Sequence, residues 1–255
     1  MARTAEVVRN TKETQIRVSV DLDGSGRAEV STGIGFFDHM LDSFARHGGI
    51  DIRVETKGDL HIDMHHTVED TGIVLGQAIA KALDGFKGIR RFGHAYIPMD
   101  ETLTRCAIDL SNRPYLIWKV AFKTPKVGDM DTELFKEFHH ALAMNLGACV
   151  HLETLYGDNS HHIAESGFKA LARALRQAVE LDPKTQGQAP YEFPLAGFQG
   201  DARGHGPGIV AYVAAQHHGY AHLPKDPAEP REQGRNNRYT ALDDGRPHHM
   251  PFFRP

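Results

Sequence analysis

The feature that most constrains the fold of this chain is an internal repeat. When the sequence is shifted by 98 residues, IRVET at 52–56 aligns with VHLET at 150–154. With two residues of slippage, HHTVE at 65–69 aligns with HHIAE at 161–165. A chance match of the short motif alone would not bring the neighbouring strand into alignment as well. One spacing that recurs across two helical segments and a strand therefore indicates an internal duplication.

Hydrophobic periodicity predicts the elements of both halves. Alternating apolar residues indicate strands, and apolar residues three and four apart indicate helices. In the first half we expect a hairpin of strands 16–20 and 27–31, a helix at 36–46, a strand at 50–56 and a helix at 65–83. In the second half we expect strands at 95–99, 103–110 and 115–122, a helix at 134–146, a strand at 148–154 and a helix at 161–181. The predicted fold class is α/β (α+β), with two internally duplicated βα half-domains.

The duplicated region predicts one domain at residues 1–190, with repeat halves of about 9–92 and 93–190. After Pro190 the composition changes, since residues 191–255 are rich in Gly, Pro, His and Arg. Only the segment IVAYVAA at 209–215 has the apolar character needed for burial. We therefore expect residues 191–255 to form a divergent, disordered C-terminal tail.

The composition argues against several classes of protein. The net charge of −4 at pH 7 gives no electrostatic support to the binding of nucleic acid or of an anionic membrane. The N-terminus has no apolar signal-peptide stretch, and no apolar run is long enough to span a bilayer. The 2 cysteines, Cys106 and Cys149, lie in apolar strand-like segments and indicate no disulfide framework. We expect a cytoplasmic protein.

The repeated HHxxE motif is suited to binding metal ions. On a helix, residues four apart such as His65 and Glu69 project from one face. Adjacent histidines point about 100° apart, so a His-His pair reaches two ions more easily than one. His39 and Glu137 occupy matched positions in the two repeats, on the preceding helices, and are candidates for one further ligand each.

The candidate ligands are five imidazoles and three carboxylates, without a thiolate: His39, His65, His66, Glu69, Glu137, His161, His162 and Glu165. This set favours Mn²⁺ or Fe²⁺ over a closed structural zinc site, which more often includes cysteine. A solvated polar helix face is the competing interpretation of one HHxxE motif. Its duplication with both carboxylates retained favours metal binding.

Three stretches of the chain resemble the signature blocks of the imidazoleglycerol-phosphate dehydratase family. They are GIGFFDHMLDSFARHGGIDI at 33–52, GDLHIDMHHTVEDTGIVLG at 58–76 and DNSHHIAESGFKALARALRQA at 158–178. The resemblance extends from about residue 9 to residue 190. It implies halves made of a small sheet backed by helices, in the manner of domain 2 of ribosomal protein S5. It also implies two Mn²⁺ ions per subunit and a homo-oligomeric shell of 24 subunits with metal sites between subunits.

The activity that the resemblance implies is that of a hydro-lyase of histidine biosynthesis. Its members remove water from D-erythro-imidazoleglycerol phosphate to give imidazole-acetol phosphate. The proton to be removed is not acidified by a carbonyl, so the reaction needs metal ions and a positioned base. By the resemblance, Glu13 is that base, and Arg91 and Arg113 bind the phosphate. His47 and Asp100 lie in family blocks near the substrate.

The chain departs from the family pattern after Pro190. The family usually continues with a Ser-x-Lys-Gly segment that also binds the phosphate, whereas this chain reads YEFPLAGFQG at 191–200 and contains no Ser-x-Lys-Gly downstream. One alternative is therefore a metal-binding, shell-forming homologue with impaired catalysis. Another is an RNA-binding module, because the implied fold is shared with a ribosomal protein. The acidic charge balance argues against RNA binding.

Truncation after Pro190 should leave folding, metal content and assembly nearly unchanged, because the predicted tail offers little apolar surface to bury. Size-exclusion chromatography and elemental analysis of the truncated and full-length chains check this expectation. Collapse of the assembly on truncation would instead mean that the segment 209–215 packs into the core.

Overall fold

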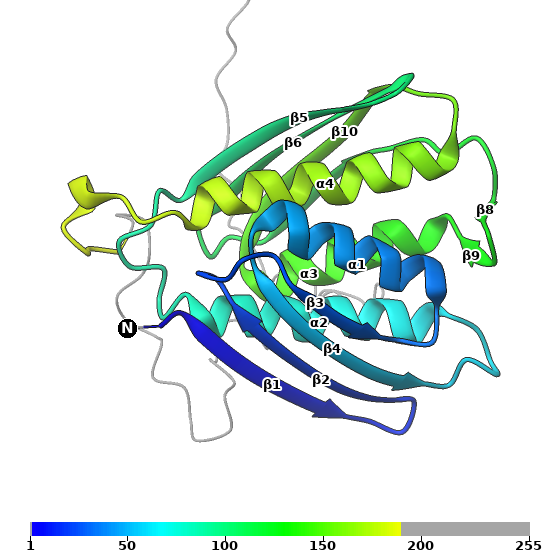
Figure 1. Cartoon of the computed structure of the whole chain (residues 1–255), viewed down its shortest axis with the longest axis horizontal. Helices are drawn as coiled ribbons and strands as arrows, with labels where there is room; N and C mark the ends of the chain where they lie inside the picture. Colours follow the sequence, from blue (N-terminus) through cyan, green and yellow to red (C-terminus); the bar gives the residue numbers. More distant parts are fainter. Residues whose placement is uncertain (1, 190–255) are drawn as a thin grey trace, which may run out of the picture. The chain divides into compact units, whose positions relative to one another are not determined.

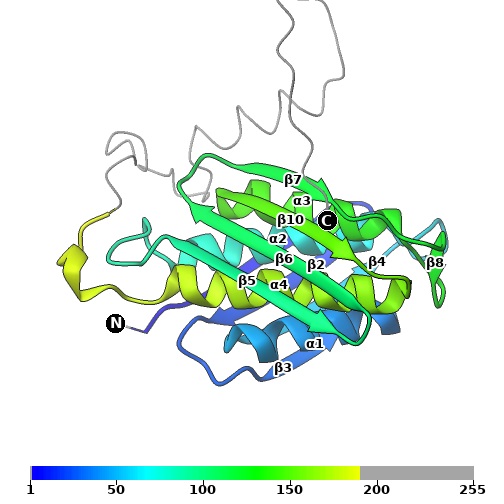
Figure 2. The same ribbon diagram turned by 90° about the horizontal axis from the view of Figure 1, so that it is seen from above.

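Two four-stranded sheets enclose a layer of helices in this computed structural model (Figure 1). The structure describes residues 2–189. The predicted tail at 191–255, with its segment 209–215, lies outside the described residues. Viewed from above, the second sheet lies over the helices and the first sheet lies beneath them (Figure 2). The predicted α/β fold of two duplicated halves is confirmed.

Each half has the order of three strands, a helix, a strand and a second helix. The first half comprises β1 (Thr4–Asn10), β2 (Thr14–Asp21), β3 (Ala28–Ser31), α1 (Gly35–Gly48), β4 (Asp51–Gly58) and α2 (His65–Ala82). The second half comprises β5 (Phe92–Met99), β6 (Thr102–Leu110), β7 (Tyr115–Lys119), β8 (Lys126–Val127), β9 (Met130–Asp131), α3 (Glu133–Leu146), β10 (Ala148–Tyr156), α4 (Ser160–Val179) and the short 3-10 helix η1 (Pro183–Thr185). The β8–β9 hairpin is an insertion that the sequence pattern did not predict.

The strand order and the direction of pairing are the same in both halves. The sheet orders are β1-β2-β4-β3 and β5-β6-β10-β7, and only the last pair in each order is parallel. Asn10 pairs with Gln15 across the first turn, and Pro98 pairs with Leu103 across its counterpart. Residues 11–14 therefore correspond to residues 99–102, a correspondence that matters for the site below.

The predicted hairpin of strands 16–20 and 27–31 was wrong. β2 is paired antiparallel with β1 and β4, and β3 pairs parallel with β4 instead. Alternating burial shows which face of a strand is covered, but it carries no information about the neighbouring strand. β1 itself was not predicted, because its inward side chains Ala5 and Val7 are only partly buried.

The helices of the two halves pack against each other between the sheets. α2 lies on β1 and β2, α4 lies on β5 and β6, and the pairs α1–α4 and α2–α3 meet within the layer. The aromatic ring of Phe138 on α3 lies 5.3 Å from that of Phe37 on α1 and 5.1 Å from that of Phe168 on α4, measured between ring centroids. All three side chains are buried, so this cluster joins the halves through a common core.

Two glycines allow α2 and α3 to approach closely. A Cβ atom at Gly72 would stand 2.8 Å from the carbonyl oxygen of Phe138, and one at Gly76 would stand 2.7 Å from that of Leu142. These contacts are with backbone, which cannot move aside as a flexible side chain does. The glycines therefore fix the separation of two helices that carry candidate metal ligands.

Replacing Gly76 with alanine should lower the free energy of unfolding by about 1–3 kcal/mol, because the added methyl group forces the two helices apart. Urea unfolding provides the measurement. Gly167→Ala is the matched control, since its Cβ would meet only Leu152 at an ordinary 3.6 Å. There, the better helix propensity of alanine should stabilise α4 by up to about 1 kcal/mol. Equal stability of the two variants would contradict this account of the α2–α3 contact.

Candidate metal centre

Three side chains from the two halves converge on one point. Nε2 of His39, on α1, lies 3.6 Å from Oε2 of Glu165, on α4. Nε2 of His161 lies 3.1 Å from the same oxygen. One donor atom from each of the three lies within 4.8 Å of the others, and within residues 2–189 this is the only such group of three His, Cys, Asp or Glu side chains. Two imidazole nitrogens and a carboxylate oxygen match the donors of a divalent transition metal.

Local structure holds these donors in place. The Asn159 side chain caps α4 and accepts hydrogen bonds from the backbone N–H groups of His161, at 2.9 Å, and His162, at 3.5 Å. The ring of Phe36 meets that of His161 edge to face, with centroids 5.0 Å apart. Because residues four apart lie on one helix face, His161 and Glu165 point the same way.

A lysine balances the charge of the central carboxylate. Nζ of Lys169 lies 2.8 Å from Oε1 of Glu165, whose side chain is only 11% exposed. Burial acts to raise the pKa of Glu165, but the Lys169 hydrogen bond and charge and the His161 hydrogen bond outweigh it, so the pKa lies below its ordinary value. Glu165 is therefore ionised at neutral pH and able to bind a cation.

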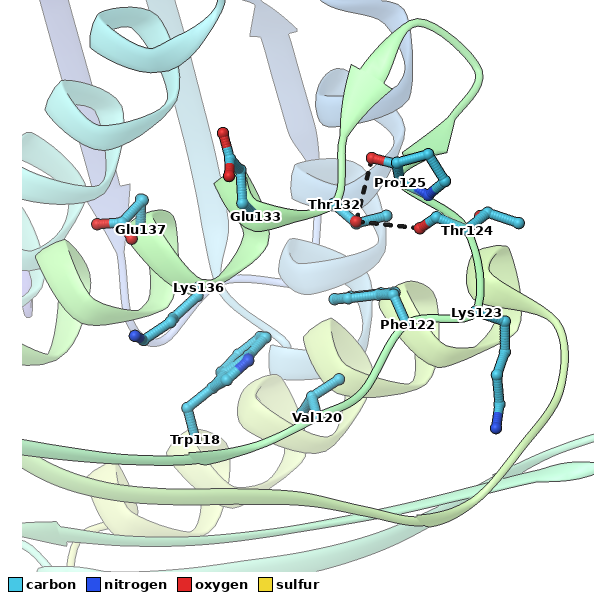
Figure 3. A pocket seen from close by; sticks show the side chains of 10 residues that line it. All are labelled: Trp118, Val120, Phe122, Lys123, Thr124, Pro125, Thr132, Glu133, Lys136 and Glu137. Carbon is cyan, nitrogen blue, oxygen red and sulfur yellow. Dashed lines mark hydrogen bonds between the residues drawn. The ribbon is translucent and has the colours of Figure 1, made fainter.

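The first-half counterpart is less complete within one chain. Nε2 of His65 lies 3.2 Å from Oε2 of Glu69, in the arrangement of the second-half pair. Glu137 belongs to α3 and borders a pocket of 620 Å³ beside Trp118 and Lys136 (Figure 3). In the described part of the chain, the structure does not place Glu137 in a three-residue cluster with His65 and Glu69.

The second histidine of each pair contacts a different carboxylate. Nδ1 of His66 lies 3.0 Å from Oδ2 of Asp59, and this hydrogen bond raises the pKa of His66. Nδ1 of His162 lies 2.7 Å from Oε2 of Glu101. The His162 hydrogen bond, aided by one from the backbone N–H of Asn159, holds the pKa of Glu101 well below its usual range. The structure thus does not place His66 or His162 in the His39 cluster.

The two predicted phosphate arginines meet at one aspartate. Nε of Arg91 lies 2.6 Å from Oδ1 of Asp109, and Nη2 of Arg113 lies 3.8 Å from Oδ2 of the same side chain. Arg91 has a positive φ of 73° and its guanidinium lies 4.7 Å above the ring centroid of Phe92. The Arg91 side chain is only 13% exposed, whereas that of Arg113 is 65% exposed. The pair forms a positive site that is partly neutralised by Asp109.

The other three predicted site residues, His47, Asp100 and Glu13, lie on three different elements. His47 lies in the last turn of α1, where burial lowers its pKa and the charges of Lys169 and Arg173 lower it further. Asp100 occupies the β5–β6 turn with φ 48°, and its Oδ2 lies 3.8 Å from Nε2 of His162. Glu13 is exposed in the β1–β2 turn, where its backbone N–H donates to Oγ1 of Thr11.

The sequence analysis missed Lys169, Asp59 and Glu101. Lys169 follows Glu165 by four residues on a helix, so its contact with that carboxylate could have been inferred from spacing. Glu101 is separated from its partner His162 by 61 residues, and no local pattern connects them. Asp59 precedes His66 by 7 residues across a loop, and its contact depends on the path of that loop.

These observations define a class of protein: an internally duplicated α/β chain with a histidine–carboxylate centre between its halves. A family model described as imidazoleglycerol-phosphate dehydratase matches residues 32–175. A protein of that name from Phenylobacterium zucineum is 87% identical over 190 residues, covering 74% of this chain and 97% of that protein. One from Azorhizobium caulinodans is 61% identical over 188 residues, covering 74% of this chain and 95% of that protein.

Solved structures give the same result. The crystal structure of imidazoleglycerol-phosphate dehydratase from Staphylococcus aureus superposes with a TM-score of 0.64 at 38% identity, covering 70% of this chain and 99% of that one. The enzyme from Pyrococcus furiosus gives a TM-score of 0.62 at 39% identity, covering 69% of this chain and 94% of that one. The chain belongs to the imidazoleglycerol-phosphate dehydratase family, and is therefore a hydro-lyase of histidine biosynthesis.

No helix within residues 2–189 combines the length and the apolar character needed to cross a membrane.

His39→Ala should lower the divalent metal content of the purified protein, because it removes one of the three converging donors. The side chain is 50% exposed, so the fold should tolerate its loss. Elemental analysis after dialysis against a weak chelator provides the measurement, with His94→Ala, an exposed histidine on β5, as the matched control. An unchanged metal content in His39→Ala would contradict the assignment of this cluster.

Proposed function

We propose that this chain removes water from D-erythro-imidazoleglycerol phosphate to give imidazole-acetol phosphate, using two Mn²⁺ ions per subunit. The observation that carries the proposal is the convergence of His39, His161 and Glu165 from both halves. The substrate is the one after which the related imidazoleglycerol-phosphate dehydratases are named. Turnover of this substrate with Mn²⁺ supplied, measured beside metal analysis of the same preparation, tests both parts of the proposal.

The donor set fits manganese. Imidazole nitrogen and carboxylate oxygen are ligands that Mn²⁺ accepts in octahedral geometry, and neither site includes a thiolate. Bound ions would supply Lewis acidity to the substrate's imidazole ring. The residues proposed to hold the two ions are those of the two HHxxE motifs and their helical partners: His39, His65, His66, Glu69, Glu137, His161, His162 and Glu165.

We assign the proton transfer to Glu13. The proton leaves the carbon that bears the middle hydroxyl, and its removal requires a carboxylate that is not itself a metal ligand, because ligation lowers basicity. Glu13 is exposed, and its charge contributes to the raised pKa of His66 after the hydrogen bond and charge of Asp59 and the charge of Asp63. The proposed base does not belong to the three-residue cluster of His39, His161 and Glu165.

The phosphate is assigned to Arg91 and Arg113. Guanidinium groups bind phosphate through paired, charge-assisted hydrogen bonds. Asp109 accepts two hydrogen bonds from Arg91, which orient its guanidinium group, and lies 3.8 Å from that of Arg113. His47 and Asp100 are proposed to contact the substrate between the phosphate and the ring.

We further propose a cytoplasmic homo-oligomer of 24 subunits. The His39 cluster offers three protein donors, which leaves an octahedral ion three positions short. The Nε2 atoms of His66 and His162 do not enter that cluster, so a neighbouring subunit is the natural source of a further donor. Residues 1–190 would form the catalytic domain of each subunit.

Glu13→Gln should reduce turnover by about 10²-fold or more at unchanged metal content, because the amide keeps the shape of the side chain but does not accept a proton. Steady-state kinetics and elemental analysis of one preparation check both statements. Glu29→Gln, whose side chain is 76% exposed on β3, is the control and should retain full turnover. Wild-type turnover in Glu13→Gln would move the base to another residue, with Asp100 as the next candidate.

A further inference from the structure

Asp59 and Glu101 share one relationship to the two His-His pairs. Oε2 of Glu101 lies 2.7 Å from Nδ1 of His162, and Oδ2 of Asp59 lies 3.0 Å from Nδ1 of His66. An ionised carboxylate only accepts hydrogen bonds, so each of these Nδ1 atoms must carry the ring proton. A neutral imidazole then has its free lone pair on Nε2.

We propose that Glu101 and Asp59 are positioning residues that keep the proton of His162 and His66 on Nδ1, so that Nε2 of each ring is the metal ligand. This inference rests on the proposed function, which makes both histidines ligands. Carboxylates that accept a hydrogen bond from a ligating histidine fix its tautomer and the orientation of its ring.

Glu101 performs this role with both of its oxygens engaged. Oε1 accepts hydrogen bonds from the backbone N–H of Asn159 at 2.9 Å, that of Asp158 at 3.3 Å, and the hydroxyl of Thr102 at 2.8 Å. Oε2 is thereby left to His162. The same side chain fixes the loop before α4, because Asn159 also caps that helix. Its two oxygens are therefore not interchangeable.

Asp59 is held less firmly. Its two oxygens lie 3.2 Å and 3.0 Å from the same Nδ1 atom of His66. Within the described residues, no donor from another residue forms a further hydrogen bond with this carboxylate. Either oxygen can accept the proton of His66, so rotation of the Asp59 side chain would not change the tautomer.

The duplication explains why the two acceptors come from different places. Glu101 occupies the position in the β5–β6 turn that Glu13 occupies in the β1–β2 turn. In the second half, the turn residue Glu101 accepts the hydrogen bond from Nδ1 of His162. In the first half, Asp59 from the segment after β4 takes over that contact. Within the described residues, the Glu13 carboxylate forms no hydrogen bond with His66 and is exposed, as a base requires.

Replacing each carboxylate with its amide should affect Mn²⁺ binding differently at Glu101 and at Asp59. In Glu101→Gln, the amide oxygen remains with its three donors, so the NH₂ group faces Nδ1 and drives the ring proton to Nε2. Affinity for Mn²⁺ should fall by about 10–100-fold. In Asp59→Asn, the amide can turn its oxygen towards Nδ1, so affinity should stay near the wild-type value. Asp59→Ala removes the acceptor and should cost about 10–100-fold as well.

The measurement is a titration of metal-free protein with Mn²⁺, followed by the electron paramagnetic resonance signal of the free ion. Glu153→Gln is the matched control, because Glu153 pairs with Arg105 on the outer face of the second sheet and should not affect binding. The melting temperature without metal should be similar in wild type and Glu101→Gln, since the contacts of Oε1 are retained.

A double-mutant cycle identifies the route of the effect. If Glu101 acts through His162, Glu101→Gln should not weaken binding further in a His162→Ala background. An equal loss in both backgrounds would reduce Glu101 to a structural role and overturn the proposal. Wild-type affinity in both Glu101→Gln and Asp59→Ala would overturn it as well. If the wild-type protein converts its substrate without binding Mn²⁺, the proposed metal dependence, from which the inference starts, would be contradicted instead.

Discussion

The packing of helices from both halves into one layer is the interaction on which the site depends. Phe138 on α3 contacts Phe37 of the first half and Phe168 of the second, so a single buried cluster sets the distance between the halves. The same layer brings His39 on α1 to within 3.6 Å of Glu165 on α4. Close-packed interiors transmit small displacements rather than absorb them. The distances between donor atoms on α1 and α4 therefore depend on the packing of the core between these helices.

At the two HHxxE motifs, carboxylates are divided between two tasks. Glu69 and Glu165 lie beside Nε2 atoms, where a cation would be held, and the charge of Glu165 is balanced by Lys169. Asp59 and Glu101 lie beside Nδ1 atoms, where they orient rings. The division follows from the imidazole ring itself, which in its neutral form is a donor at one nitrogen and an acceptor at the other. The two halves contain one copy of this arrangement each, and they differ in the carboxylate that contacts the second histidine, which is Asp59 in the first half and Glu101 in the second.

Much of the fold could be predicted, because helices and strands with one buried face carry their period in the sequence. The elements that were missed lack that signal: β1 has only partly buried inward positions, and β8 and β9 have two residues each. The partner of β3 was missed for another reason, since α1 crosses between β3 and β4 and places them side by side. Periodicity describes a strand and its faces, not its neighbours.

The sequence by itself determined the duplication, the helices that carry the HHxxE motifs and the geometry within each motif, because residues four apart on a helix must share a face. Tertiary structure decided which donors meet. His39 joins the motif of the other half, at Glu165, because α1 packs against α4. It also decided which nitrogen of His162 faces Glu101, across 61 residues of chain. Both depend on contacts between segments distant in sequence, which only the packed core and the strand register bring together.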